Sequence, residues 1–355
     1  LAGRQATVEG EFICAGGRDR CDRQCRINRI RIRDKVHPFG GACDRHTNLR
    51  FQREIETGAL DGVAQRQRLL FEHALLEPAP GHGQDGRTVG IMRSFLTYSL
   101  LPLHATFFSR LGFRVLLSEP GDTAGVGRTG AAFCRPAALS HAACINLLAR
   151  RPDFLFAPHI MQIPVANPPT FSRTCVFVQG EPYVLQATFR RELEASGTRM
   201  LAPIFRMQEG FNQARDAFLS LGMDLGASRR DTAEAFDDAC ARQLQFEAAI
   251  QKQGRKFLAE LEGDPDAFGL VLFGRPYNAF AGEANMGIPH KIASHGFRVI
   301  PCDMLPQDDA TGDHPNMYWA TGQKLLRTPR FVRARKNLFG VYVPLFSCGP
   351  VSFLA

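Results

Sequence analysis

The sequence lacks a run of about 18 consecutive apolar residues, the length that reads as a membrane-spanning helix, so we expect no membrane span. Its first residues, Leu1-Ala2-Gly3-Arg4, contain neither an initiator Met nor the apolar region of a signal peptide. The chain has 10 cysteines. Without a secretory signal, cysteines favour a reducing compartment, where thiols stay free or bind metals. We therefore expect a cytoplasmic protein.

Common catalytic motifs are absent as well. There is no HExxH motif and no convincing pairing of a nucleophile with a base. The glycine-rich segment 125–130 lacks both the Lys-Ser/Thr pair of a phosphate-binding loop and the spacing of a dinucleotide-binding motif. The sequence therefore identifies no catalytic residue and gives little support to nucleotide binding.

The composition is that of a globular protein. The 355 residues allow two or three domains, and the hydrophobic and charged fractions of 45% and 22% are ordinary. The net charge of +8 comes largely from arginines in residues 18–33 and 327–336. Solvated arginines explain this excess most simply, and an anionic ligand such as the phosphates of coenzyme A is an alternative. We do not expect a nucleic acid partner.

Short apolar runs alternate with helical patterns from residue 87 onward. Strands are predicted at 89–91, 113–117, 154–157, 183–185, 269–273, 297–300 and 338–345, and helices at 100–111, 136–150, 287–295, 316–335 and over most of 208–262. This alternation implies parallel sheets with helices on both faces. The predicted fold class is α/β, with two Rossmann- or flavodoxin-like units joined by helices and a small N-terminal Cys-rich module.

The same patterns divide the chain. We predict a Cys-rich module at 1–50, a polar linker at 51–86, a first α/β unit at 87–207, a helical bridge at 208–265 and a second α/β unit at 266–355. The chain ends very soon after Cys348. We therefore expect the second unit to be cut short, and the chain to be an interior piece of a longer polypeptide or a split gene product.

The N-terminal module contains Cys14, Cys21, Cys25 and Cys43 in the pattern Cys-x6-Cys-x3-Cys-x17-Cys. Fifty residues bury too little to be stable alone, so a metal, either Zn or a second cluster, is an attractive staple. The Cys-x2-Cys pairs of typical four-cysteine sites are absent. Free structural thiols remain the alternative.

Three other cysteines occupy positions typical of ligand sites. Cys348 follows a strand-like run and precedes Gly349-Pro350, as expected at the carboxyl end of a strand in an open α/β sheet. Cys134 precedes a helical pattern, and a helix N-terminus lowers the pKa of a thiol. Cys175 opens an apolar, strand-like run. Separated thiols at strand and helix ends suggest a soft-metal or iron–sulfur site, with buried inert cysteines as the alternative.

The remaining candidates are weaker. Arg275 and Tyr277 follow a predicted strand, where the guanidinium can bind a phosphate or carboxylate or belong to a structural turn. His159 also follows a strand and either contacts a ligand or is simply hydrogen-bonded. Cys144 and Cys240 fall at apolar helix positions and are predicted to be core. Cys302 follows a strand and is left undecided.

Six short motifs occur in order along the chain: Val89-Gly90-Ile91-Met92-Arg93, Leu111-Gly112-Phe113, Cys134-Arg135-Pro136, Gly274-Arg275-Pro276-Tyr277-Asn278, Asn316-Met317-Tyr318-Trp319 and Phe346-Ser347-Cys348-Gly349-Pro350. With them, roughly residues 10–355 resemble the uncharacterised middle region of acyl-CoA dehydratase activase-related proteins, together with the cysteine module that precedes it. These are large bacterial relatives of the 2-hydroxyglutaryl-CoA dehydratase system.

This resemblance implies a chemistry. In the dehydratase subunits that the region resembles, three cysteines hold a 4Fe–4S cluster between Rossmann-like domains, and an ATP-driven activase supplies one electron. By similarity, Cys134, Cys175 and Cys348 are the best cluster ligands here. The sequence departs from the family at Met92, where Pro is usual, and at Val351, where Asp is usual. The activase's phosphate-binding motifs are absent, so we do not expect ATP hydrolysis by this chain.

Two functional hypotheses follow. In the first, the chain is an iron–sulfur redox protein of the 2-hydroxyacyl-CoA dehydratase/activase class, with an ATP-dependent activase domain or subunit as partner and an acyl-CoA-like substrate. In the second, it is a non-catalytic scaffold with a Zn-stapled N-terminal module that docks the activase component.

Overall fold

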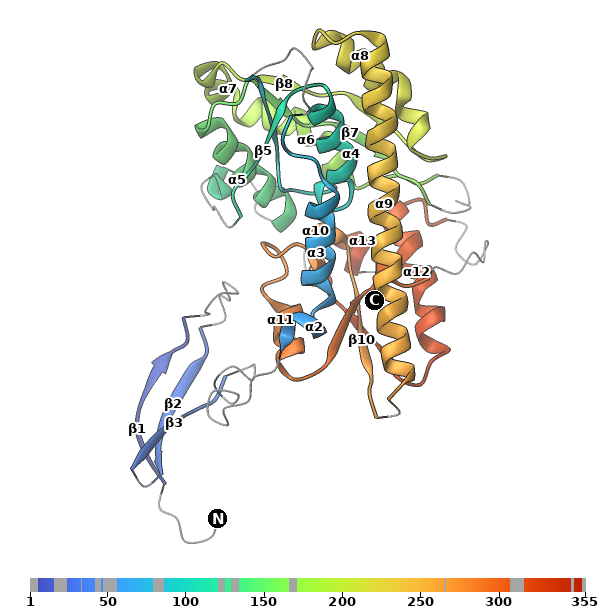
Figure 1. The fold of residues 1–355 in the computed structure, drawn as a ribbon. Coiled ribbons are helices and arrows are strands. Elements are labelled where there is room, and N and C mark those ends of the chain that lie inside the picture. Colours follow the sequence, from blue (N-terminus) through green and yellow to red (C-terminus); the bar gives the residue numbers. More distant parts are fainter. Residues whose placement is uncertain are drawn as a thin grey trace.

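A computed structural model describes residues 6–15, 24–32, 34–41, 46, 56–78, 86–120, 125–128, 134–165, 171–264, 266–306, 316–345 and 348–352. Its first element is a small antiparallel sheet of three strands, β1 (Ala6–Ile13), β2 (Arg26–Ile32) and β3 (Lys35–Phe39), in the order β1-β2-β3. In Figure 1 this sheet extends away from the larger α/β body.

The first α/β unit contains a four-stranded parallel sheet in the order β5-β4-β6-β8. Its strands are β4 (Thr88–Ile91), β5 (Arg114–Leu117), β6 (Phe154–Phe156) and β8 (Arg199–Leu201). Its helices are α4 (Thr97–Arg110), α5 (Arg135–Ala149), α6 (Val176–Thr188) and α7 (Arg190–Ser196), with a short 3-10 turn at Val126–Arg128. Two further parallel strands, β7 (His159–Gln162) and β9 (Ile204–Arg206), pair with each other.

The second α/β unit is smaller. Its parallel sheet has the order β11-β10-β12, with strands β10 (Gly269–Phe273), β11 (Arg298–Pro301) and β12 (Leu338–Tyr342). Its helices are α10 (Pro276–Ala279), α11 (Ile288–Ser294), α12 (Ala320–Arg333) and α13 (Gly349–Ser352), with a 3-10 turn, η4, at Cys302–Met304. The predicted α/β class with two flavodoxin-like parallel sheets is thus confirmed.

Both sheets place the first strand of the unit between the second and the third. The chain therefore changes winding direction between β4 and β6 in one sheet and between β10 and β12 in the other. In open α/β sheets, ligands bind beyond the carboxyl ends of the strands at such a switch point. The segments after β4, β10 and β12 are accordingly where the fold favours a binding site.

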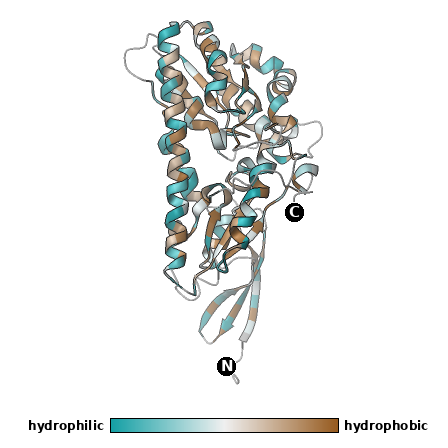
Figure 2. Ribbon diagram, turned by 90° about the vertical axis from the view of Figure 1, so that its right-hand side faces the viewer, coloured by the Kyte–Doolittle hydropathy of each residue, from teal (hydrophilic) through white to brown (hydrophobic). Residues whose placement is uncertain are grey.

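A helical bridge joins the two units. It consists of η3 (Phe211–Ala214), α8 (Arg215–Asp224) and α9 (Arg229–Glu262). With 34 residues, α9 is about 50 Å long and runs past both sheets (Figures 1 and 2). The Ser228 hydroxyl caps it by accepting a hydrogen bond of 3.0 Å from the Asp231 amide. Its buried face includes Phe236, Phe246 and Phe257, which pack into the main core.

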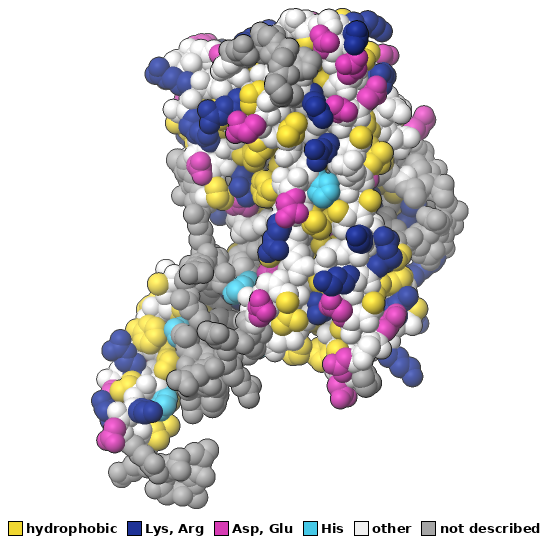
Figure 3. Space-filling view, in the orientation of Figure 1, with side chains coloured by type: hydrophobic (Ala, Val, Ile, Leu, Met, Phe, Trp, Pro, Cys, Tyr) yellow, Lys and Arg dark blue, Asp and Glu magenta, His cyan; other side chains and the backbone are white. Residues whose placement is uncertain are grey.

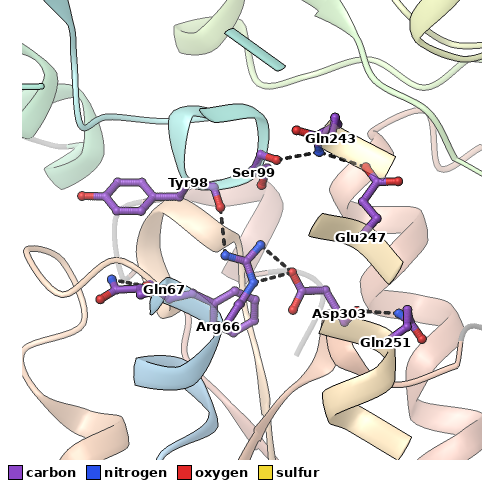
Figure 4. A network of polar contacts seen from close by, with 9 residues as sticks. Arg66, Gln67, Tyr98, Ser99, Gln243, Glu247, Gln251 and Asp303 are labelled. Atoms are coloured by element: carbon purple, nitrogen blue, oxygen red, sulfur yellow. Dashed lines mark hydrogen bonds and ion pairs between the residues drawn. The ribbon is translucent and has the colours of Figure 1, made fainter. Parts of the chain in front are cut away.

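Part of the segment 51–86 differs from the linker that the sequence predicts. It forms α2 (Thr57–Leu60) and α3 (Gly62–His73), and α3 buries Val63, Arg66 and Leu70. The polar composition concealed this helix because only one face of it is covered. Arg66, which is 1% exposed, donates to the Asp303 carboxylate and to the Tyr98 carbonyl oxygen at 2.8 and 2.9 Å (Figure 4). The guanidinium thus connects α3 with α4 and with η4 of the second unit.

The strands predicted at 183–185 and at the run opening with Cys175 are wrong, because both segments lie at or in helix α6. The apolar valines there suit a strand, but the buried residues Val178, Glu181, Pro182 and Leu185 recur with helical spacing. The helical spacing of the buried residues, and not the short apolar run, therefore determines the structure of this segment.

Two surface properties bear on partners. Among the described helices, none combines the length and the apolar character that crossing a bilayer requires. On the face in Figure 3, Lys and Arg side chains of the described residues are interspersed with Asp and Glu side chains. This arrangement is that of a solvated charged surface and not of a basic stripe along one element.

Candidate functional site

Cys134, Cys175 and Cys348 line one cavity of about 220 Å³. We call it the cysteine cavity. The same cavity is lined by Phe95 of the first unit and by Arg275 and Tyr277 of the second; the other lining residues are Pro136, Val176, Phe177, Asn278, Leu345, Gly349, Pro350 and Val351. Side chains more than 200 positions apart in the sequence are therefore brought to one place between the two sheets.

The fold explains this convergence. Cys134 is the N-cap residue of α5, and Cys175 is the N-cap residue of α6. Cys348 follows β12, its amide donating to the Leu345 carbonyl oxygen at 2.9 Å just before α13 begins. Helices that return from a parallel sheet start at the carboxyl edge of that sheet, so all three thiols lie where the switch points direct ligands.

Arg275 and Tyr277 also come from a carboxyl edge. Arg275 is the N-cap residue of α10, directly after β10 and Gly274. A Cβ at Gly274 would lie 2.5 Å from the Ala279 Cβ of α10 and 3.0 Å from the Val343 carbonyl oxygen just after β12, so only glycine allows this close packing. Arg275 is 7% exposed and donates to the Tyr277 hydroxyl at 2.8 Å. The cavity that the three thiols line therefore also contains the buried, permanently charged guanidinium of Arg275.

Phe95 closes the cavity from the first unit. Its ring meets that of Tyr277 edge to face, with the centroids 5.5 Å apart. Its backbone has a φ of 38°, a left-handed conformation that costs a bulky residue on the order of 1–3 kcal/mol. Strained backbone of this kind collects at functional sites and persists because the surroundings hold it in place.

A buried carboxyl group supports the cysteine cavity from behind. Glu181 on α6 accepts hydrogen bonds from Ser94, at 3.0 Å, and from Ser140 on α5. It therefore ties the helix that begins after Cys175 to the helix that begins after Cys134. Burial raises the pKa of Glu181 to about 7, although the two serines oppose the shift.

The electrostatics of Cys134 differ from the prediction. A helix N-terminus favours a thiolate, yet the pKa of Cys134 is raised, first because burial disfavours its charged form. Charges on Cys175 and Cys348 raise it further, while the Ala137 amide and Arg275 act in the other direction. Desolvation and like-charge repulsion thus outweigh the helix terminus and the positive charge of Arg275.

The donor set can be tested against a metal. No three His, Cys, Asp or Glu side chains in the described ranges have the placement of a site for a single metal ion. The three cysteines line a shared cavity without converging on one point. Three thiols are nevertheless the residue type that an iron–sulfur cluster requires, because such clusters are held by cysteine thiolates.

Three other cysteines have different surroundings. Cys144 is fully buried in α5 among Leu147, Leu155 and Phe189, as a core residue. Cys240 is half-buried on α9, and burial raises its pKa to about 12. Cys302 is buried and lines a second cavity.

His159 lies outside the residues that line the cysteine cavity. Its Nδ1 is 2.7 Å from the Gln179 carbonyl oxygen, and its ring lies 4.5 Å from that of Tyr183. The structure therefore gives this histidine the hydrogen-bonded role that was the alternative to ligand contact.

The N-terminal sheet brings two of its predicted ligands together. The Cys14 amide donates to the Cys25 carbonyl oxygen at 2.9 Å. His46, which the sequence reading did not select, places its Nε2 3.5 Å from the Cys14 sulfur. Cys21 and Cys43 lie outside the described residues. The position of His46, three residues after Cys43, was the sequence signal that could have identified it as a candidate ligand.

The fold and its site define a class: an α/β protein of two parallel-sheet units with a thiol-lined cavity at their carboxyl edges. The family whose description is CoA enzyme activase uncharacterised domain matches residues 88–305, more than half of the chain. The chain belongs to this family. Cys134 and Cys175 lie within the matched residues, whereas Cys348 and the N-terminal module lie beyond them. In comparisons with curated proteins and with solved structures, nothing matches.

Proposed function

We propose that the chain is an iron–sulfur redox component of a CoA enzyme activase system, with Cys134, Cys175 and Cys348 as the cluster ligands. The observation that carries this proposal is the single cavity lined by these three cysteines and by a buried arginine. The family match and the resemblance to dehydratase subunits support it further.

The residues of the cavity have distinct tasks in this proposal. A 4Fe–4S cluster, when bound, supplies one-electron transfer at low potential. The three thiolates would hold the cluster, one fewer than in a four-cysteine site. Arg275 balances part of the negative charge of the thiolates, and the apolar rings of Phe95 and Tyr277 exclude water.

We further propose an ATP-dependent activase domain or subunit as electron donor, and an acyl-CoA-type compound as the substrate of reduction or dehydration. Membership of the CoA enzyme activase family supports this partner. The chain itself lacks a phosphate-binding loop, so ATP hydrolysis is assigned to the partner. Thiols held for a low-potential cluster suit a reducing compartment, and we propose the cytoplasm.

Anaerobic purification tests the cluster. We expect a brown protein that contains iron and acid-labile sulfide, and Cys348→Ser should lose both. Cys302→Ser is the control, because this thiol lines the other cavity. A colourless wild-type protein, or equal iron in Cys348→Ser and Cys302→Ser, contradicts the proposal.

The N-terminal sheet supports a second candidate function, a Zn-stapled scaffold that docks the activase. The contact of Cys14 with His46 favours a metal there, since sulfur and imidazole nitrogen are the usual ligands of zinc. Metal analysis separates the two candidates: a scaffold contains one zinc per chain and no sulfide. In that case Cys14→Ser removes the metal, and Cys348→Ser leaves it in place.

A further inference from the structure

A second cavity, of about 280 Å³, lies against the same loops as the cysteine cavity. Adjacent residues line different cavities: Phe95 and Arg275 line the first, whereas Leu96 and Pro276 line the second. We call the second one the charged cavity, because Arg66, Glu247, Asp303 and Lys324 lie in its wall. Its size is near the lower end of the range for small-molecule sites.

Two of these charges are already satisfied within the wall. Arg66 and Asp303 form an ion pair of 2.7 Å, and the Asp303 carbonyl oxygen accepts from Gln251 at 2.8 Å (Figure 4). This pair is therefore part of the framework of the cavity. The two charges compensate each other, although Asp303 Oδ1 has no hydrogen-bond partner among the described residues.

Gln243 fixes the orientation of Glu247. Its amide nitrogen donates to the Ser99 carbonyl oxygen at 2.9 Å and to Glu247 Oε1 at 3.0 Å, as Figure 4 shows. Two acceptors can be served only by the NH₂ group, so this amide orientation follows from its neighbours. The carboxylate of Glu247 is thus held in place by a neutral donor, and its charge is not neutralised.

Glu247 and Lys324 are the two charges without an ion pair. Within the part of the chain that the structure describes, neither forms a salt bridge, and both are half-buried at the cavity wall. Burial lowers the pKa of Lys324, while the negative charge of Glu247 acts against this shift. The two charges therefore interact electrostatically, although they form no ion pair. Unpaired charges in a partly dry site are costly, so a ligand that pairs both gains affinity.

Apart from the polar residues Ser99, Gln243, Gln251 and Thr321, the rest of the wall is apolar. Leu100, Phe246 and Phe280 are buried core residues that line the cavity; Leu96, Ile163, Phe211, Ile250 and Leu325 add to the same surface. A ligand that fits must therefore carry a hydrocarbon body besides its charged groups. A carboxylic acid would leave Glu247 unpaired, and an amine would leave Lys324 unpaired.

We propose that the charged cavity binds an apolar α-amino acid, with its ammonium group on Glu247, its carboxylate on Lys324 and its side chain against Leu100, Phe246 and Phe280. This binding is a function separate from the cysteine cavity and uses none of the three proposed cluster ligands. The proposal holds whether or not a cluster is present.

Isothermal titration of the full chain with L-norleucine, L-leucine and L-phenylalanine tests the proposal. Hexanoate and pentylamine are the matched probes, because each retains the hydrocarbon of norleucine and one of its two charges. We expect one site per chain, and about tenfold or greater loss of affinity for each half-molecule. If none of the three amino acids binds at millimolar concentration, or if hexanoate binds as tightly as norleucine, the proposal is wrong.

Two variants assign the charges. Glu247→Gln should weaken norleucine about tenfold or more without weakening hexanoate, and Lys324→Met should weaken norleucine without weakening pentylamine. Glu262→Gln and Lys252→Met change exposed residues of α9 and should leave every affinity unchanged. Cys348→Ser should also bind norleucine normally, which separates this test from that of the cluster. Equal losses in the cavity and control variants would overturn the assignment.

Discussion

The cysteine cavity and the charged cavity use the same two sheets but are supported differently. The wall of the charged cavity contains an arginine–aspartate pair that joins α3 to η4. Behind the cysteine cavity stands one carboxyl group, Glu181, held by two serines. The first support is permanently charged, because a guanidinium does not lose its proton in proteins. The second changes its charge near neutral pH, since the pKa of Glu181 is about 7.

The largest expected loss of stability comes from removing the ion pair that supports the charged cavity. Arg66→Met leaves the Asp303 carboxylate without its partner and should lower the free energy of unfolding by roughly 3–5 kcal/mol. Urea denaturation measures this loss. Arg230→Met, which breaks an exposed pair with Glu234 on α9, should change the free energy of unfolding much less. Similar losses in both variants would mean that Arg66 contributes no more than a surface arginine.

The two supports should also differ in how their contribution to stability depends on pH. Because folding raises the pKa of Glu181 from 4.5 to about 7, the folded state holds this proton more tightly than the unfolded chain does. The free energy of unfolding therefore falls as the pH rises through this interval, by roughly 3 kcal/mol. Glu181→Gln keeps the acceptor for both serines and should remove this fall.

Urea midpoints between pH 4.5 and 8 measure the effect of Glu181→Gln, taken as the difference from wild type. The matched control is Glu194→Gln, at an exposed position of α7. A difference curve that stays flat over the whole range for Glu181→Gln would show that its carboxyl group does not titrate in the folded protein as described.

Close packing of α9 on the second unit gives a smaller effect. A Cβ at Gly254 would collide with the Met304 carbonyl oxygen in η4. Gly254→Ala should therefore lower the free energy of unfolding by about 1–3 kcal/mol, as overpacking does. Gly180→Ala on α6 meets no atom within 4 Å and should stabilise the protein slightly, because alanine favours a helix. Opposite signs of the two shifts in melting temperature are the expected outcome.

The smallest expected effect lies at the far end of α9. Ser228→Ala removes the N-cap oxygen that accepts from Asp231 and should cost about 1 kcal/mol. Ser220→Ala, at an exposed position of α8, is the control. Neither variant should alter iron content or amino acid binding, because Ser228 lines neither cavity. A changed affinity would mean that the end of α9 is coupled to the charged cavity.

The sequence predicted much of the α/β frame. Strands at Val89–Ile91 and Gly269–Phe273 were recognisable because short, continuous apolar runs are typical of parallel strands buried on both faces. The bridge was predicted as mostly helical, and α8 and α9 confirm this prediction.

The two cavities differ in how much of them the sequence revealed. The thiols stood out because cysteine at a strand or helix end is distinctive, and the structure brings Cys134, Cys175 and Cys348 together. The charged cavity was not predictable, because Arg66 and Asp303 are 237 positions apart and each looks like an ordinary surface residue. Only the packing of α3 against η4 gives them a shared role.

Two pairs of consecutive residues, Phe95-Leu96 and Arg275-Pro276, separate the two cavities. Leu96 and Pro276 face one compartment, and their chain neighbours Phe95 and Arg275 face the other. A ligand in the charged cavity therefore contacts residues that are covalently bonded to Phe95 and Arg275, although none of the three thiols lines its site.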